Sequence, residues 1–382
     1  MKKSNIFLAI ILASSSSSVF AADSFNARSM ALGGTSVATG GFGVASVSPA
    51  MTGSFDEDDD FGTRINFGIE ASDPDSFLDE IDVAKDEIDV FQSKIDAGTA
   101  APGDEDAALD AIKSLQGKVV DLGVGLDFQA AIPGSYLGAA VFVVSSARIG
   151  IDFSYDDADE TNVILGQDAL ESSVRSSGYG ITEAGVSLSH TIEDLSYGTL
   201  TLGVAPKYQR VDLIDYEASV SAFETSDIRD DMVNETGFNA DLGALYSFGE
   251  NSEFATGLVI RNIVSVDVEG KSGETFKIRP VPTAGFSYDN GWISSSFEID
   301  GAKTYGYGLI EDSQFARAGV EIDAFQWAQI RFGYRDDISG GREDVVSAGL
   351  GLSPFNVVNI DLAGLYGKND TYGVALQIGA RF

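Results

Sequence analysis

Charged side chains recur at alternate positions of apolar segments, where they could bind a ligand or pair with one another. Arg64 and Glu70 lie in FGTRINFGIE, Glu321 in FARAGVEIDAF and Arg331 in WAQIRFGYRDD. Alternation places such groups on one polar face of an extended strand. By this parity the polar-face candidates are Arg64, Glu70, Arg261, Arg317, Glu321, Arg331 and Arg335, accompanied by Lys207, Glu298 and Asp361.

Two interpretations of this polar face remain open. Arginine could hold the carboxylate of a fatty acid, or another anion, through two parallel hydrogen bonds. Alternatively, the side chains could form internal salt-bridge networks that fill and stiffen the protein. The mixture of both charge signs favours the second interpretation.

Catalytic and metal chemistry find little support in the sequence. The single histidine, His190, shares the parity of Val186 and Leu188, so we expect it to face outward and not to join a Ser-His-Asp site. The glycine-rich GTSVATGGFG lacks the lysine of a phosphate-binding loop. The acidic runs at 56–60 and 156–160 lack the ligand spacing of an EF-hand, although they could supply oxygen ligands to Ca²⁺. We therefore predict no enzyme, no cofactor and no metal site.

The alternating segments themselves predict an all-β, transmembrane antiparallel β-barrel. A soluble sandwich shares such alternation, but these segments run about 9–12 residues, the length a tilted strand needs to cross a bilayer. Lipid tolerates no open sheet edge, so the strands must close on themselves. The candidate strands, about fourteen in number, are 61–71, 118–132, 135–146, 177–193, 198–215, 235–248, 254–264, 274–288, 291–300, 314–323, 326–336, 342–352, 356–367 and 371–382.

The two ends of the chain indicate export and insertion. A positive start, the apolar run IFLAIILA and the small residues of SVFAAD predict a signal peptide over 1–21. The last strand carries an apolar stripe of Tyr372, Val374, Leu376, Ile378 and Phe382, which we expect to face lipid. This terminal pattern resembles the signal that the barrel assembly machinery recognises. We expect the outer membrane of a Gram-negative bacterium, with its lipid and that machinery as partners.

The charge and cysteine content of the chain exclude one class of partner and one source of stability. The chain has 59 Asp+Glu against 24 Lys+Arg, which argues against nucleic acid because nucleic-acid binding requires a basic surface. It has no cysteine, so its stability cannot come from disulfides.

Two segments depart from strand alternation. Residues 22–55 are rich in Gly, Ser and Ala and could form a plug inside the barrel or a flexible leader in the periplasm. Within 73–118, Phe77, Ile81, Ala84, Ile88 and Phe91 recur at helical spacing and predict a helical hairpin, either a lid or a docking site for a partner. The predicted organisation is therefore a signal peptide (1–21), a plug (22–55) and a barrel (56–382) with a helical insert (73–118).

The segment ARSMALGGTSVATGGFGVASVSPA resembles the N-terminal region of FadL-type (fatty-acid-transporter-like) barrels, where a glycine-rich stretch precedes an Asn-Pro-Ala turn. Here the turn is Ser48-Pro49-Ala50, and serine can also stabilise a turn. ARSMALGGTSVA, the helical insert and GLDFQAAIPGSYLGAAVFV together resemble the exported conjugal-transfer TraF-type proteins. The thioredoxin-like proteins that share this name differ, since this chain has no Cys-x-x-Cys for disulfide chemistry.

This resemblance implies a FadL-like barrel of about fourteen strands with an N-terminal plug. One function it suggests is a passive channel for hydrophobic or amphipathic small molecules. The other is an envelope component that assists conjugal transfer or mating through contacts with envelope proteins, without conduction. A barrel that escorts or anchors other surface proteins is a third possibility.

Overall fold

The computed structural model describes residues 25–54, 60–132, 134, 137–164, 171–195, 197–222, 231–325, 327–354 and 357–382. The predicted signal peptide, most of the acidic run at 56–60 and Pro133 of the IPG turn lie outside these described residues.

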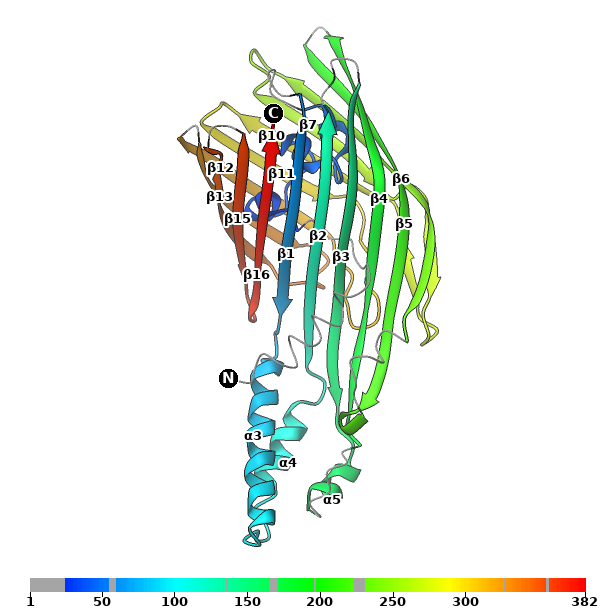
Figure 1. The fold of residues 1–382 in the computed structure, drawn as a ribbon, viewed down its shortest axis with the longest axis vertical. Coiled ribbons are helices and arrows are strands. Elements are labelled where there is room, and N and C mark those ends of the chain that lie inside the picture. Colours follow the sequence, from blue (N-terminus) through cyan, green and yellow to red (C-terminus); the bar gives the residue numbers. More distant parts are fainter. Residues whose placement is uncertain are drawn as a thin grey trace.

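Fourteen antiparallel strands close into a transmembrane barrel, which Figure 1 shows from the side. The first strand pairs with the last in continuous register, from Gly62 opposite Arg381 to Ser72 opposite Thr371, and this pairing closes the wall. The predicted fold class is therefore confirmed. The barrel strands are β1 (Gly62–Ser72), β2 (Val119–Ile132), β3 (Gly138–Ser154), β4 (Ser173–Leu195), β5 (Gly198–Ser219), β6 (Val233–Phe248), β7 (Phe254–Arg261), β10 (Val281–Asp289), β11 (Ile293–Asp300), β12 (Phe315–Phe325), β13 (Ala328–Asp337), β14 (Val345–Leu352), β15 (Val358–Gly367) and β16 (Thr371–Arg381).

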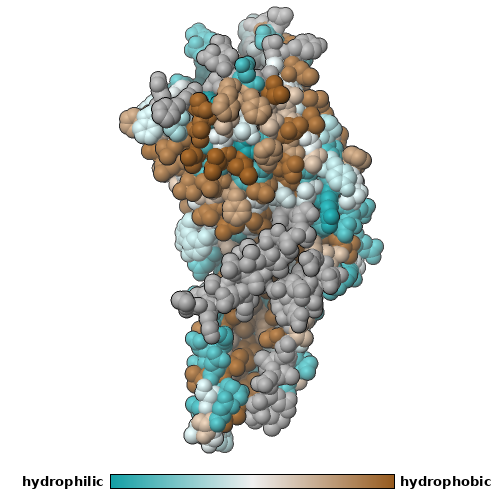
Figure 2. Space-filling view, in the orientation of Figure 1, coloured by the Kyte–Doolittle hydropathy of each residue, from teal (hydrophilic) through white to brown (hydrophobic). Residues whose placement is uncertain are grey.

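The alternation read from the sequence separates an apolar outer face from a polar lumen. In β16, Thr371, Ala375 and Gln377 are buried, whereas Val374 between them is 52% exposed and Phe382 after the strand 62%. The whole predicted C-terminal stripe faces outward, as a wall in contact with lipid requires. Figure 2 shows, in the same orientation as Figure 1, hydrophobic side chains spread over the outer surface of the barrel.

One predicted wall strand, 274–288, is wrong in its first part. The chain leaves the wall after β7 and forms a separate hairpin, β8 (Val266–Glu269) with β9 (Thr275–Ile278), before β10 begins at Val281. Hairpin and wall strand share the same alternation, so the sequence pattern does not separate them. The hairpin packs in the lumen against Tyr179 and Leu213 of β4 and β5, and closes the mouth at that end.

The strands β3, β4 and β5 run past the boundaries that we predicted from the sequence. β3 continues to Ser154, beyond the predicted end at 146. On its outward side Val141 and Val143 are exposed, whereas Ile149 and Ile151 further along are buried in an apolar cluster. Helices cover this far part of the wall, so its outward apolar side chains are buried by protein.

The predicted helical insert follows β1 as α3 (Phe77–Asp96) and α4 (Asp106–Ser114). Both helices pack on the outward side of the extended β2 and β3, through residues such as Phe77 and Leu109. Asp73 accepts hydrogen bonds from the backbone N–H groups of Phe77 (2.7 Å) and Leu78 (3.0 Å) and so caps the start of α3. A short helix, α5 (Ala158–Ile164), lies in the next loop at the same end (Figure 1).

Among the described residues, none of the helices is long and apolar enough to cross a membrane.

Candidate functional site: the lumen and its N-terminal segment

Residues 25–54 lie inside the barrel; we call them the luminal segment. They form helix α2 (Ala27–Ala31) and two 3-10 turns, η1 (Gly41–Val44) and η2 (Pro49–Gly53). The side chain of Asn26 accepts a hydrogen bond from the Ser29 N–H at 2.9 Å and so begins α2. The helix ends at Gly33, whose φ of +71° suits glycine. α2 packs against β13–β16 and β1, while η2 packs against β3–β6, so the segment spans the lumen.

Glycines of the wall provide the recesses in which this segment lies. A Cβ on Gly203 of β5 would stand 2.3 Å from the carbonyl carbon of Pro49, and one on Gly243 of β6 would stand 2.9 Å from the Ala50 nitrogen. The predicted Ser48-Pro49-Ala50 turn is therefore the point of closest contact with this side of the wall. Other wall glycines leave similar space for Ala31, Leu32 and Val37 of the segment. They are Gly257, Gly285, Gly319, Gly333 and Gly349.

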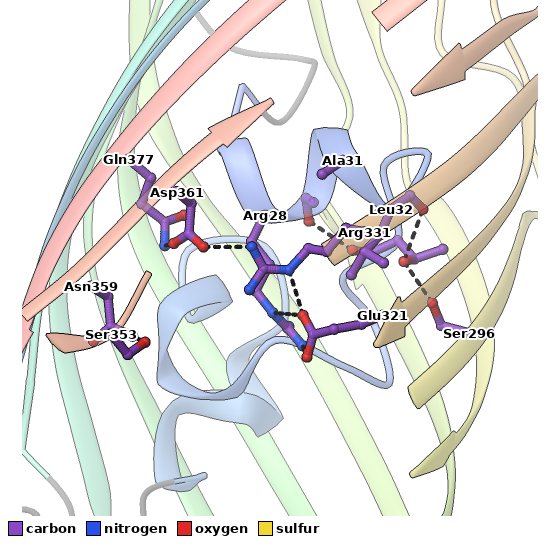
Figure 3. A network of polar contacts seen from close by, with 12 residues as sticks. Arg28, Ala31, Leu32, Ser296, Glu321, Arg331, Ser353, Asn359, Asp361 and Gln377 are labelled. Atoms are coloured by element: carbon purple, nitrogen blue, oxygen red, sulfur yellow. Dashed lines mark hydrogen bonds and ion pairs between the residues drawn. The ribbon is translucent and has the colours of Figure 1, made fainter. Parts of the chain in front are cut away.

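An ion-pair chain joins the luminal segment to four strands (Figure 3). Arg28 of α2 donates to both carboxylate oxygens of Glu321 on β12, at 3.1 and 3.2 Å. Arg331 of β13 also donates to Glu321, and its Nη1 donates to Asp361 of β15 at 2.5 Å. Gln377 of β16 completes the chain with a 2.6 Å hydrogen bond to Asp361. Each charge is thereby neutralised inside the protein.

A second set of contacts fixes the middle of the luminal segment. The buried carboxylate of Glu298 accepts the backbone N–H groups of Ser36, at 2.6 Å, and of Val37. Two hydroxyl pairs add to this, Thr35 with Ser296 at 2.8 Å and Thr52 with Ser187 at 2.6 Å. These bonds depend on the exact position of the segment, so its displacement would break them together.

Three arginines converge on Glu70 beyond the luminal segment. Glu70 of β1 is 4% exposed and accepts hydrogen bonds from Arg148 of β3 at 2.9 Å, from Arg335 of β13 at 3.1 Å, and from Arg342. Arg335 and Arg342 also lie over the ring of Phe315, within 4.9 and 5.3 Å of its centroid. Because β1, β3 and β13 are not neighbours in the wall, this cluster bridges the lumen.

All seven polar candidates from the sequence lie on the luminal side, and the structure brings most of them into ion pairs. Arg64 pairs with Asp127 at 3.2 Å, and Arg317 pairs with Asp300 at 2.9 Å. Lys207 lies between Glu183 and Asp241 at 2.9 and 2.8 Å, and Arg261 lines two small cavities nearby. The pairing favours the salt-bridge interpretation over a ready-made carboxylate site.

Sequence reasoning missed three arginines of these networks, Arg28, Arg148 and Arg342, and also four of the carboxylates, Asp127, Glu183, Asp241 and Asp300. Arg28 was part of the expected plug, but nothing in its local pattern marks a partner nearly 300 residues away. Arg148 lies beyond residue 146, where the predicted strand ends, although its alternation with Ala147 and Ile149 matches that of a luminal residue. Arg342 lies in the β13–β14 connection, outside any strand.

Among the cavities along the described part of the lumen, three border the luminal segment. Two are small, about 40 and 60 Å³, and the third measures about 500 Å³. The largest is bounded by the luminal segment and by the ends of β1, β13, β15 and β16 that lie beside the short turns. Its lining is mainly polar.

The remaining candidates are structural. His190 lies on the same outward face as the exposed Val186, as parity predicts. In the acidic run at 156–160, Asp159 accepts the N–H groups of Glu171 and Ser172 at 2.7 and 2.8 Å. Although burial acts to raise its pKa, these hydrogen bonds and that of the Ser172 hydroxyl hold the pKa of Asp159 below its usual range. Among the described residues, acidic, histidine and cysteine side chains form no group of three that could hold a metal ion.

Solved structures with the same fold are hydrocarbon transporters and their relatives. The Ralstonia pickettii toluene transporter TbuX matches with a TM-score of 0.56 at 9% identity, covering 94% of this chain and 98% of its own. The Pseudomonas putida toluene transporter TodX matches with a TM-score of 0.55 at 13% identity, covering 96% and 98%. A Pseudomonas aeruginosa FadL homologue matches with a TM-score of 0.54 at 10% identity, covering 96% and 99%. At these identities the likeness establishes the FadL-like fold alone.

Comparison of sequences gives the family. Among curated proteins, no sequence matches the chain significantly. A family model described as "F plasmid transfer operon, TraF, protein" matches residues 47–300. This match starts in the luminal segment and runs through the helical insert to the end of β11, about two thirds of the chain. The chain therefore belongs to the TraF family of the F plasmid transfer operon, and it has the fold of the FadL-type barrels.

Proposed function

We propose that this protein is a passive channel for hydrophobic or amphipathic small molecules in the outer membrane, closed in the conformation described above. The observation that carries the proposal is the luminal segment itself, which fills a closed barrel and is attached to the wall by side-chain contacts. A barrel used only as an anchor would not need a removable segment across its lumen. The toluene transporters that share the fold support the same substrate class.

The luminal segment acts as the plug in this proposal. The two small cavities beside it, about 40 and 60 Å³, hold only a few water molecules, so a ligand cannot pass until the segment moves. At the other end Tyr179 and Leu213 pack with the β8–β9 hairpin in a buried apolar cluster, which a hydrophobic ligand would contact once the hairpin moves. Transport then requires two rearrangements, one of the hairpin at the mouth and one of the plug.

The orientation in the membrane follows from the connections between strands. All six connections at one end, such as 290–292 between β10 and β11, are short, whereas those at the other end include 73–118. In outer-membrane barrels the short turns face the periplasm and the long loops face the outside. The helices α3 and α4 thus lie outside the cell, and we propose a signal peptide over 1–21 for export. The proposed channel needs no catalytic activity.

A second function is favoured by one observation on the helical insert. Val83 and Val90 of α3, one heptad apart, are 54% and 52% exposed on the side away from the wall. Two such residues could contact an envelope protein during conjugal transfer or mating, which the family name suggests. Deletion of 73–118 distinguishes the two functions, because a channel should keep its uptake whereas an adaptor should lose its mating phenotype.

Uptake in cells tests the proposed channel. Cells with and without the protein are given labelled long-chain fatty acids and small aromatics, and heat-modifiable migration on a gel verifies insertion in the same samples. Saturable uptake that depends on the protein is the expected result. An inserted barrel without uptake of any of these ligands would contradict the channel.

A further inference from the structure

The largest luminal cavity, near the short-turn end, has the size of a small-molecule site. Its volume of about 500 Å³ falls within the usual range for ligand pockets, roughly 300–1,000 Å³. It is separated from the apolar mouth by the luminal segment and by the Glu70 cluster. The cavity therefore needs its own explanation, because its polar lining does not suit a hydrocarbon.

Most of the charged groups around this cavity are paired; Asp323 also lines it, and its carboxylate is a further hydrogen-bond acceptor. Arg28 binds Glu321, and Arg331 binds both Glu321 and Asp361. Arg64 binds Asp127 behind the lining. A charged ligand would have to break one of these pairs and leave a buried charge without its partner, which is costly.

The pairs still offer hydrogen bonds to a neutral molecule. The side chains of Arg28 and Glu321 are 21% and 15% exposed, so their ion pair is accessible. A guanidinium has five N–H donors and a carboxylate about four acceptor positions, and the contacts between these two residues occupy only some of each. A hydroxyl group can accept from one and donate to the other without separating them.

Neutral polar groups extend this surface. Gln329, Asn359 and Ser54 also line the cavity. On the opposite side, Gly40 and Gly41 adopt φ values of +115° and +58°, a left-handed backbone that favours glycine and directs η1 along the cavity. The lining thus offers both hydrogen-bond donors and hydrogen-bond acceptors.

We propose that this cavity binds a neutral, hydroxyl-rich small molecule, such as a sugar or another polyol, from the short-turn side of the barrel. Only a ligand whose groups both donate and accept can use the paired ions and the amides together. The inference does not depend on the proposed channel, since it concerns a different region of the lumen and a different class of ligand.

Ligand-observed NMR and calorimetry on the purified full-length protein in detergent test this inference. The probes are glucose and maltose, compared with acetate as an anion and glycine as a zwitterion. We expect saturable binding of at least one of the two sugars and none of acetate or glycine. Gln329→Trp should fill the cavity and weaken sugar binding by about tenfold or more, a change of about 1.4 kcal/mol or more.

Two further variants keep this test decisive. Leu350→Trp adds the same ring to the outward face of β14, where Leu350 is 55% exposed, and should leave sugar binding unchanged. Asn359→Leu removes an amide from the lining without adding bulk, and should weaken binding even if Gln329→Trp does not fold. The proposal is overturned if neither sugar binds, if acetate or glycine binds instead, or if the folded cavity variants bind sugar as the unmodified protein does.

Discussion

Arg28 and Glu321, 293 positions apart in the chain, are joined by two hydrogen bonds inside the barrel, at 3.1 and 3.2 Å. Glu321 also binds Arg331 of the neighbouring strand. If Arg28 moves away, the carboxylate keeps one partner in the wall. The contact between Arg28 and Glu321 thus attaches the luminal segment to the wall. When this contact breaks, Glu321 remains paired with Arg331.

Removal of the Glu321 charge should loosen the luminal segment. In Glu321→Gln both Arg28 and Arg331 lose an anionic partner, and we expect a loss of stability of about 2 kcal/mol, at the low end for a partly exposed pair. A double-mutant cycle that combines Glu321→Gln with Arg28→Met isolates the energy of the Arg28–Glu321 contact. The chain has no cysteine, so a maleimide reacting with Ser29→Cys can report the loosening. Equal reaction rates with and without Glu321→Gln would argue against it.

Filling a wall recess should displace the same segment. A Cβ at Gly203 would stand 2.3 Å from the Pro49 carbonyl carbon, so Gly203→Val is incompatible with the present position of η2. We expect larger and more frequent conductance steps in planar bilayers. Gly364→Val on β15 is the matched control, because the nearest atom to its Cβ would be 3.8 Å away. Identical conductance of the two variants would mean that the segment does not obstruct the lumen.

The Glu70 cluster should be a major source of stability near the outer mouth. Glu70→Gln removes the carboxylate that Arg148, Arg335 and Arg342 share, although Arg148 keeps Asp121 at 2.7 Å, and we expect a cost of about 3 kcal/mol. The temperature at which migration on a gel shifts from folded to unfolded measures this cost. Asp336→Asn on the same wall should change stability by no more than about 0.5 kcal/mol. Similar transition temperatures for both variants would refute this role.

Acid should loosen the helical insert. The Lys118 side chain binds Glu80 of α3 at 2.5 Å, and this hydrogen bond, with that of Ser114, lowers the pKa of Glu80. A carboxyl with a depressed pKa contributes stability above its unfolded pKa, about 4.3, and loses it as the pH falls through the folded pKa. The protection factors of the amides in 77–114, which remove the intrinsic pH dependence of exchange, should therefore fall below about pH 4. Glu80→Gln should abolish this acid-dependent part of the exchange, whereas Glu87→Gln on the same helix should retain it.

The strand pattern could be predicted from the sequence because lipid imposes it. Outward apolar residues and inward polar residues alternate wherever the wall meets the membrane, as in Val374 and Gln377 of β16. The prediction was wrong where this constraint ends. The β8–β9 hairpin alternates because it packs in the mouth, and the far part of β3 is apolar on its outward side because α3 and α4 cover it.

The site could be predicted only in part. Parity placed Glu70, Glu321 and Arg331 on the luminal face, but it cannot say which of them meet. Closure of the barrel decides that Arg335 reaches Glu70 from the other side of the lumen. The partners of Arg28 depend on how residues 25–54 fold inside the wall, which no local pattern encodes.

A reversible lock on the luminal segment gives the most direct test of the channel. The hydroxyls of Thr35 and Ser296 are 2.8 Å apart, so the pair Thr35→Cys with Ser296→Cys should form a disulfide between segment and wall. Ser72→Cys with Thr371→Cys, whose parent hydroxyls are also 2.8 Å apart, makes the control bond within the wall. We predict that oxidation stops uptake of labelled fatty acid or toluene only in the first variant, and that a reductant restores it. Undiminished uptake by the oxidised first variant would contradict the account.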